Sequence, residues 1–287
     1  MKRIIILISV LFIANTLTPQ SLLWEISGKG LQTSYLYGTI HIQDKRVFQY
    51  DDIVEKKIME CDAYAMELLI DEIKREDIEK SMLMKKHTIN GLLSEEDYAL
   101  LDSTLKAEVG AGMLMLNKMK PFFIASQLMQ ADMSKDMEEA LDIYFLNKAK
   151  KASKLIFGIE QLSDQIGAID QISLDEQCKM LMDAIRDTLK EEQQFDDLLK
   201  AYLSGNLDTM LVLSSDTSLP EKFNKAFLID RNKGMAKNII KFCKKQKTFN
   251  AIGAAHLGGE KGVIALIRKK GYSVKPIPFK FKGTSIN

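Results

Sequence analysis

The sequence has few of the residues that cross-link a fold. Cysteine occurs at only three of 287 positions, namely Cys61, Cys178 and Cys243. None of them stands in a Cys-x-x-Cys, and an odd, sparse set argues against a disulfide framework. Buried thiols are the first interpretation, and a single disulfide is the alternative.

Neither sign of charge is in excess, and no basic block is present. The chain has 40 lysines and arginines against 39 aspartates and glutamates, a net charge of +1. The lysines are spread along predicted helices, and the run 268–270 is typical of a solvated helix end. We therefore predict no nucleic-acid partner.

Long apolar runs are also scarce. Ile4–Ala14 is apolar, follows Lys2 and Arg3, and precedes a polar stretch. It is shorter than the roughly 20 residues of a spanning helix, and the layout is that of a secretory signal peptide. We predict a signal peptide over 1–21, a single domain over 22–287, and export to a periplasm or the medium. An uncleaved amphipathic anchor is the alternative, and otherwise we expect no stable membrane span and find no oligomer signal.

Histidine is scarce as well, and two of the three histidines share one setting. Thr248–Ile252 is a predicted strand, and a Gly-x-x-His sequence ending at His256 follows it. Ser34–Ile42 is a second strand-like run, and it carries Gly-x-x-His ending at His41. Ligands of open α/β sheets bind at the carboxyl ends of strands, so we expect these two histidines to meet. His87, in Lys-Lys-His, is typical of an exposed helix residue and is excluded.

Strands and helices alternate at both ends of the chain. Leu22–Ile26 and Tyr35–Gly38 are a predicted strand pair. Residues 35–68 and 248–277 each have the order strand, Gly-x-x-His, helix, strand, which predicts two βαβ units with parallel pairing inside each. The fold class is α/β, with a central mixed or mostly parallel sheet, flanking helices and a large helical insertion. Residues 279–287 are predicted to be a loose tail.

The helical middle of the chain is rich in methionine. Met113, Met115, Met119, Met129 and Met133 crowd it, out of 15 in the whole chain. Methionine is an adaptable filler of hydrophobic cores, and we interpret the group mainly in that way. An apolar groove for a peptide or lipid is the alternative.

Two glutamates resemble the histidines in their placement. Glu67 lies in a predicted strand, where an unpaired charge is costly to bury, and Glu160 ends another predicted strand. Imidazole and carboxylate together suit a divalent transition metal such as zinc, manganese, cobalt or iron. The predicted metal ligands are therefore His41, Glu67, Glu160 and His256. Such a metal lowers the pKa of its water, and a glutamate that is not a ligand can act as general base.

The paired motifs resemble those of the TraB/GumN (TraB/PrgY/GumN) family, which includes Tiki-type metalloproteases and pheromone-shutdown proteins. They are GTIH at Gly38–His41 and GAAH at Gly253–His256. Four further stretches are similar to the family and extend the resemblance over most of the mature chain: AYAMEL around Glu67, Ala140–Lys151, Phe157–Ile166 and Leu228–Ile239. This chain has Ile159 before Glu160, where the family usually has leucine.

The resemblance implies a fold similar to that of erythromycin esterases and haem-binding ChaN proteins. Arg231 and Asn232 match the Arg-Asn pair of the family, which implies that they stabilise an oxyanion or orient substrate. From the sequence alone, Arg231 is a solvated helix charge. Asp142 and Gln165 fall in matching stretches and are candidates for supporting the site.

We therefore expect an exported metal-dependent hydrolase, a peptidase of Tiki type acting on a peptide or protein. The cofactor is a divalent transition metal (manganese, cobalt or zinc). The predicted catalytic residues are Glu67, Glu160, Arg231 and Asn232, and either glutamate can be the ligand or the base. The alternative is a binding protein without turnover that sequesters a peptide signal or haem. A structural protein with a decayed site is the third possibility.

Overall fold

The structure, a computed structural model, describes residues 21–214 and 221–282. The predicted signal segment lies outside the described residues except for Ser21, and its boundary stays a prediction. The Ser21 hydroxyl donates to the carbonyls of Leu23 and Ile277, so this residue is hydrogen bonded to the folded domain.

Six strands form one sheet in the order β4-β3-β5-β2-β1-β6. They are β1 (Leu23–Ser27), β2 (Ser34–Thr39), β3 (Ala63–Met66), β4 (Leu155–Gly158), β5 (Thr248–Gly253) and β6 (Ser273–Pro276). Strands β4, β3, β5 and β2 are parallel neighbours. Strand β1 is antiparallel to both β2 and β6. The sheet is therefore mixed and mostly parallel, which confirms the predicted α/β class and the β1–β2 pair.

The predicted direct pairing within each βαβ unit is wrong. Strand β5 lies between β2 and β3, and β2 and β1 lie between β5 and β6. Strand β5 is buried along nearly its whole length, and a strand that is apolar on both faces is stable only between two other strands with both faces covered. The second half of the chain therefore supplies the central strand of the first half.

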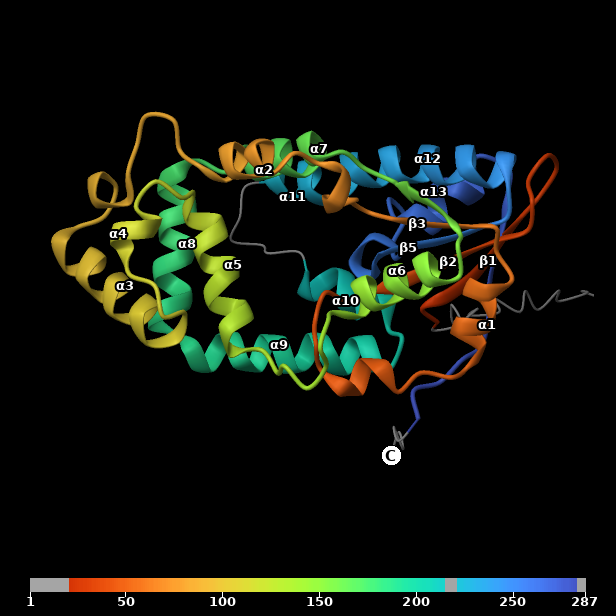
Figure 1. Cartoon of the computed structure of the whole chain (residues 1–287), viewed down its shortest axis with the longest axis horizontal. Helices are drawn as coiled ribbons and strands as arrows, with labels where there is room; N and C mark the ends of the chain where they lie inside the picture. Colours follow the sequence, from red (N-terminus) through yellow and green to blue (C-terminus); the bar gives the residue numbers. More distant parts are fainter. Residues whose placement is uncertain (1–20, 215–220, 283–287) are drawn as a thin grey trace, which may run out of the picture.

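The helices surround the sheet and extend beyond one end of it (Figure 1). They are α1 (Ile53–Met59), α2 (Arg75–Met82), α3 (Glu95–Glu108), α4 (Met113–Leu116), α5 (Pro121–Asp132), α6 (Leu141–Lys151), α7 (Leu162–Ile169), α8 (Leu174–Arg186), α9 (Thr188–Leu203), α10 (Leu207–Leu213), α11 (Glu221–Asn224), α12 (Arg231–Lys245) and α13 (Val263–Lys269). A π-helical segment, η4 (Lys225–Asp230), joins α11 to α12, and a 3-10 turn, η5 (Ala254–His256), follows β5. A capping box formed by Ser173 and Glu176 starts α8.

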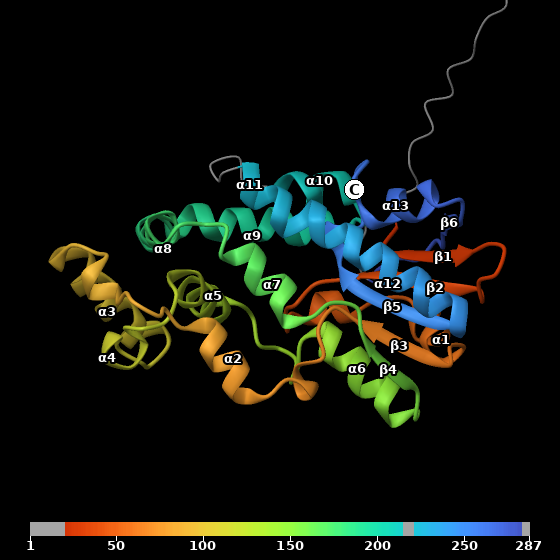
Figure 2. The same cartoon turned by 90° about the horizontal axis from the view of Figure 1, so that it is seen from above.

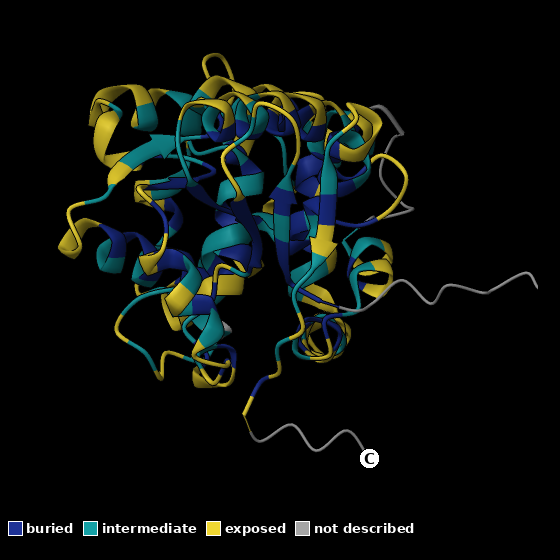
Figure 3. Ribbon diagram, turned by 90° about the vertical axis from the view of Figure 1, so that its right-hand side faces the viewer, coloured by how far each residue is buried: buried dark blue, intermediate teal, exposed yellow. Residues whose placement is uncertain are grey.

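Each face of the sheet carries its own hydrophobic layer. Tyr37, Tyr64 and Phe249 pack with residues of α1, α6 and α9 on one face. Leu36 and Ile252 pack with residues of α12 and α13 on the other face. Figure 2 shows α12 and α13 lying along the sheet, and Figure 3 shows buried strands behind an exposed outer surface. The arrangement is a three-layer α/β/α sandwich.

The helical insertion has a separate core. Helices α3, α5 and α8 enclose Leu101, Leu105, Ile124 and Leu181, on the side of the molecule away from β6 (Figure 2). Met113 is buried there, whereas Met115 is 80% exposed and Met129 is 55% exposed. Some methionines therefore fill this core and others lie at its surface.

The predicted loose tail is wrong for the residues before 283. Phe281 is 4% exposed, packs beside Tyr202 and pairs with Tyr50 through an isolated bridge. Packing the two aromatic rings of Phe279 and Phe281 stabilises this short segment by more than the conformational entropy lost in ordering it. Residues 283–287 lie outside the described residues.

The three cysteines are buried and unpaired with one another, as the first interpretation predicted. His87 is exposed, as expected, but lies in the loop after α2 rather than in a helix. Among the described residues, no helix combines the length and apolar character needed to cross a bilayer.

Candidate functional site

The four parallel strands bring the candidate residues to one edge of the sheet. His41 lies two residues beyond β2, Glu67 immediately follows β3, and Glu160 lies two residues beyond β4. His256 ends the turn after β5. These strands are adjacent, so both histidines and both glutamates lie at their shared carboxyl edge. Glu67 lies just past the strand end, which explains why a charged residue interrupts an apolar run.

The two Gly-x-x-His motifs pack directly against each other. A Cβ atom on Gly38 would lie 3.1 Å from the Cα of Ala254 and 2.7 Å from Cδ1 of Leu257. Only glycine allows this approach at Gly38, because any side chain would displace the turn that carries His256. The carbonyl of Gly38 also accepts a hydrogen bond from the Tyr202 hydroxyl at 3.0 Å. The first glycine of the motif at 38–41 therefore lets the two turns approach closely.

His256 has one nitrogen fixed and the other turned towards a carboxylate. Its Nδ1 lies 2.6 Å from Oδ1 of Asn232, whose Nδ2 donates to the Lys261 carbonyl at 3.0 Å. Since the Asn232 oxygen is the acceptor, Nδ1 carries the proton and Nε2 keeps its lone pair. Nε2 lies 3.9 Å from Oε1 of Glu67. Burial lowers the pKa of His256 to about 4, so the ring is neutral at pH 7.

His41 is oriented in the same way by an acid. Its Nδ1 lies 2.9 Å from Oδ2 of Asp142, a residue of α6. Lost hydration lowers the pKa of His41, but the Asp142 hydrogen bond and the charges of Asp142 and Glu67 outweigh it and raise the pKa to about 9. The side chain exposes 58% of its surface, so water weakens this pair relative to a buried one.

Glu67 lies at the centre of the constellation. Oε1 accepts the Gly253 amide at 2.6 Å, and Oε2 accepts from Arg231 at 3.0 Å. Burial raises the pKa of Glu67, but the charges of His256, His41 and Arg231 and the amide bond together lower it to about 2. Glu67 is therefore ionised at pH 7.

Arg231 holds both glutamates. Its Nε and Nη2 bond Glu160 at 2.7–3.1 Å, and Nη2 also bonds Glu67. Nη1 donates to the Phe227 carbonyl, and the guanidinium stacks over the Phe227 ring. Burial raises the pKa of Glu160, although Arg231 opposes the shift. Gln165 lies near enough to lower that pKa too.

The π-helical segment η4 directs neighbouring residues to different partners. Arg231 and Asn232 follow it at the start of α12, and one faces the glutamates while the other faces His256. Both are buried, at 7% and 3% exposure. The interpretation of Arg231 as a solvated helix charge is wrong, because two buried carboxylates and a carbonyl bind it. Its predicted catalytic role and that of Asn232 stay predictions.

The donor chemistry of the site fits a cation, although a complete ligand set is not assembled. Across 21–214 and 221–282, no three side chains of His, Cys, Asp or Glu come close enough together to form a metal site. His256 and Glu67 offer a neutral imidazole and a carboxylate to the same space. With His41 protonated, Asp142, Glu67 and Glu160 outnumber the positive groups by one, which favours a bound cation. His41 would have to approach this pair.

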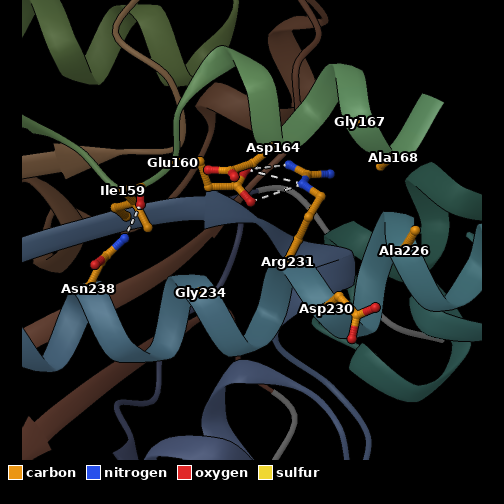
Figure 4. Close-up of a pocket in the computed structure, with 10 residues that line it drawn as sticks. All are labelled: Ile159, Glu160, Asp164, Gly167, Ala168, Ala226, Asp230, Arg231, Gly234 and Asn238. Carbon is orange, nitrogen blue, oxygen red and sulfur yellow. Dashed lines mark hydrogen bonds and ion pairs between the residues drawn. The ribbon is translucent and has the colours of Figure 1, made fainter. Parts of the chain in front are cut away.

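Two pockets flank the Arg231–Asn232 segment. One of about 260 Å³ is lined by Glu160 and Arg231 (Figure 4). The other, of about 300 Å³, is lined by Asn232 and the loop that follows His256. Neither pocket is lined by His41, Glu67 or His256. Both pockets therefore lie beside the two histidines.

Several supports of the site leave no trace in the sequence pattern. The amide of Gly253, the carbonyl of Lys261 and the ring of Phe227 act through the backbone or through packing. Asp142 and Gln165 were candidates through the family resemblance, and both lie beside predicted site residues. Helical periodicity alone marks neither of them.

Comparison with known proteins agrees with the motifs. The model of the TraB/PrgY/gumN family matches residues 22–276, and the chain belongs to this family. It is 23% identical to "Metalloprotease TIKI2" of Xenopus tropicalis over 54% of this chain and 35% of that protein. It is 22% identical to "Metalloprotease TIKI homolog" of Nematostella vectensis over 90% of this chain and 68% of that protein.

A third relative gives a similar alignment. "Metalloprotease TIKI1" of Danio rerio is 24% identical over 92% of this chain and 65% of that protein. The chain thus spans between 35% and 68% of these three relatives. No solved structure matches the chain, so the expected likeness to the ChaN and erythromycin esterase folds is not confirmed.

Proposed function

We propose that this protein is an exported metal-dependent hydrolase that cleaves peptide bonds, active in a periplasm or outside the cell. The observation that carries the proposal is the pair of anchored histidines beside a buried glutamate. His41 and His256 each have Nδ1 held by an oxygen, so Nε2 is the atom that would meet a ligand, and a protonated His41 would release its Nε2 proton on binding. Metal-binding histidines almost always have such a partner on the other nitrogen. The name of the Tiki relatives supports the same class.

The residues that would hold a divalent transition metal are His41, His256 and Glu67. A bound metal supplies an activated water and polarises the carbonyl of the peptide. Glu67 is suited to be a ligand because it is ionised and faces Nε2 of His256. Asn232 and Asp142 keep the two imidazoles in the required tautomer.

Glu160 and Arg231 would supply the proton transfer and charge stabilisation. The pKa of Glu160 is raised by burial, and a general base works best when its pKa lies near the operating pH. Arg231 binds both glutamates and would also face the negative charge that develops on the substrate oxygen. Its bidentate pairing fixes Glu160 in place before the reaction.

Thermal unfolding with manganese, cobalt, zinc or EDTA tests the metal site. The protein from Ser21 onward would be compared with the His41→Ala/His256→Ala double variant. A metal at 100 times its Kd stabilises a protein by about 2.7 kcal/mol, so we expect a higher melting temperature only in the native protein. Equal responses of the two proteins to every metal would count against this site.

Cleavage of a peptide library, followed by mass spectrometry, tests the activity. We expect cleavage with the stabilising metal and none with EDTA or with His256→Ala. Metal binding and peptide binding without cleavage would favour the alternative of a sequestering protein. A His256→Ala protein that keeps full metal-stimulated hydrolysis would exclude the proposed mechanism.

A further inference from the structure

The pocket of about 260 Å³ lies on the side of Arg231 that faces α7 and α12 (Figure 4). Glu160 and Arg231, which we assign to catalysis, form part of its wall. A single water occupies about 30 Å³ of liquid volume, so the pocket has room for a long side chain. A group bound there would touch the residues proposed to carry out the reaction.

Two glycines keep this pocket open. Gly167 of α7 and Gly234 of α12 line it from different helices. A Cβ atom at either position would meet no atom within 4 Å. Glycine inside a helix costs about 0.5–1 kcal/mol relative to alanine, and neither packing nor a positive φ explains it here. The missing side chains leave space that the fold does not need.

The polar groups of the lining offer mainly acceptors, because most N–H groups of the neighbouring Arg231 are already engaged. Arg231 donates to Glu160, Glu67 and the Phe227 carbonyl. The amide nitrogen of Asn238 donates to the Ile159 carbonyl, which leaves Oδ1 as the acceptor. Glu160 carries a carboxylate on this wall too. A ligand that matches this wall must bring its own donors.

A further carboxylate completes the acceptor wall. Asp164 of α7 lines the pocket, and its Oδ2 accepts a hydrogen bond from the backbone N–H of Gln161. Asp230 also lines it, but Lys225 and Lys233 bind that carboxylate. Asp164 is exposed, so an incoming cation can reach it from solvent. An ammonium or guanidinium group carries the donors and the charge that suit this wall.

We propose that this pocket is a specificity subsite that takes a lysine or arginine side chain of the peptide substrate, next to the bond that is cleaved. The proposal rests on the proposed peptidase function. The long aliphatic stem occupies the space left by Gly167 and Gly234, and the cationic head meets the acceptors of this wall, with Asp164 as its main partner. Neutral or acidic side chains leave these acceptors without a donor.

The test compares three peptides that differ at one position beside the cleaved bond, carrying lysine, norleucine or glutamate. Norleucine matches the lysine stem without its charge. With the metal that supports activity, we expect kcat/KM to be at least about tenfold higher for lysine, the ratio that 1.4 kcal/mol gives. Equal cleavage of the lysine and norleucine peptides at every position beside the bond would overturn the subsite while leaving the peptidase function intact.

Variants that fill the pocket test whether the preference for lysine over norleucine arises there. Gly167→Leu places a side chain into the open space, and we expect the lysine-to-norleucine ratio to fall to about one. Ser163→Leu adds the same side chain to an exposed position of α7 outside the lining and should keep the native ratio. Gly234→Leu fills the same space from α12. It replaces Gly167→Leu in the test if circular dichroism shows that Gly167→Leu is unfolded. A native ratio in a folded filled variant would overturn the proposal.

A protein that cleaves none of the peptides would contradict the proposed function, and binding then decides the subsite. Fluorescence anisotropy with the labelled lysine and norleucine peptides measures peptide binding without turnover. Tighter binding of the lysine peptide that disappears in Gly167→Leu supports the pocket as a binding site for basic side chains. Equal binding of both peptides overturns it.

Discussion

The Nδ1 atom of His256 and the Oδ1 atom of Asn232 lie 2.6 Å apart, in a buried contact. The amide of Asn232 cannot turn over without losing its bond to the Lys261 carbonyl. The tautomer of His256 is therefore determined by a backbone group on the loop that follows it. This dependence makes Asn232 the most direct point at which to perturb the site without changing a ligand.

Replacing Asn232 with leucine should lower the metal affinity about 10–100-fold, the usual effect of losing a partner of a ligating histidine. It should also cost about 1–3 kcal/mol in unfolding free energy, because Lys261 and His256 lose a buried partner. Asn238→Leu, on the same helix, removes one hydrogen bond to the Ile159 carbonyl and is the matched control. Calorimetric titration measures the metal affinity of both variants, and urea unfolding measures their stability. An equal loss of metal affinity in the two variants would contradict the role of Asn232.

Replacing Asp142 with asparagine should lower the pKa of His41 from about 9 towards its ordinary value. The variant removes the charge of Asp142, which raises this pKa, and leaves only a neutral amide oxygen as acceptor. Histidine NMR signals of the metal-free protein, followed against pH, measure it directly. Asp136→Asn, which removes an acid that bonds the Lys45 amide instead, should leave the pKa of His41 unchanged.

Replacing Arg231 with methionine should destabilise the protein by about 3–5 kcal/mol at pH 7, the cost of leaving buried charges without their partner. Glu67 and Glu160 would then face each other without a cation. Because Glu160 already has a raised pKa, it should take up a proton in the variant, and the loss should shrink at lower pH. Urea unfolding measures it.

The control for that variant is Arg268→Met. Arg268 is exposed and bonds a neutral carbonyl, that of Val274. Its removal should cost about 1 kcal/mol at any pH at which the protein is folded. Equal losses in the two variants would show that Arg231 does not hold a buried charge cluster.

The two histidines should give opposite pH dependences of stability in EDTA. The folded pKa of His256 is depressed to about 4, so its contribution is complete above its ordinary pKa of about 6.5 and is lost as the pH falls to about 4. A pKa shift of one unit corresponds to 1.36 kcal/mol, so the loss of unfolding free energy is on the order of 3 kcal/mol. The folded pKa of His41 is raised to about 9, so its contribution is complete below 6.5 and is lost as the pH rises through 9.

Urea unfolding at a series of pH values checks these signs. The stability difference between native protein and His256→Asn should rise with pH between about 4 and 6.5. The difference between native protein and His41→Asn should fall between about 6.5 and 9. A flat difference for either variant over its own range would mean that the ring does not have the environment described above.

The elements that carry the site were predictable because their signals are local. Strand β5 is a short buried run, and a glycine-rich motif follows it, so both its type and its end could be inferred from neighbouring residues. The same holds for β2 and for the capping box of α8. The placement of His41 and His256 at one edge of the sheet followed from the rule that the ends of parallel strands share an edge.

The strand order was not predictable from the same signals. Nothing within residues 35–68 indicates that β5 separates β2 from β3, because that neighbour is about 200 positions away in the printed sequence. The buried environment of Arg231 was not predictable for the same reason, because its partners Glu67 and Glu160 follow two strands that are distant in the sequence. Aromatic burial also reversed the prediction for Phe281, which is surrounded by polar residues and glycine in the sequence.

The central place of β5 has a consequence for how the protein forms. Strand β2 can pair with its long-range parallel partner only after residues 248–253 have been synthesised, and such distant contacts slow folding. During synthesis, the chain carries His41 and Glu67 on strands that still lack their common neighbour, β5. A nascent chain therefore cannot assemble this site early, and any hydrolytic activity arises only when the last seventh of the chain has joined the sheet.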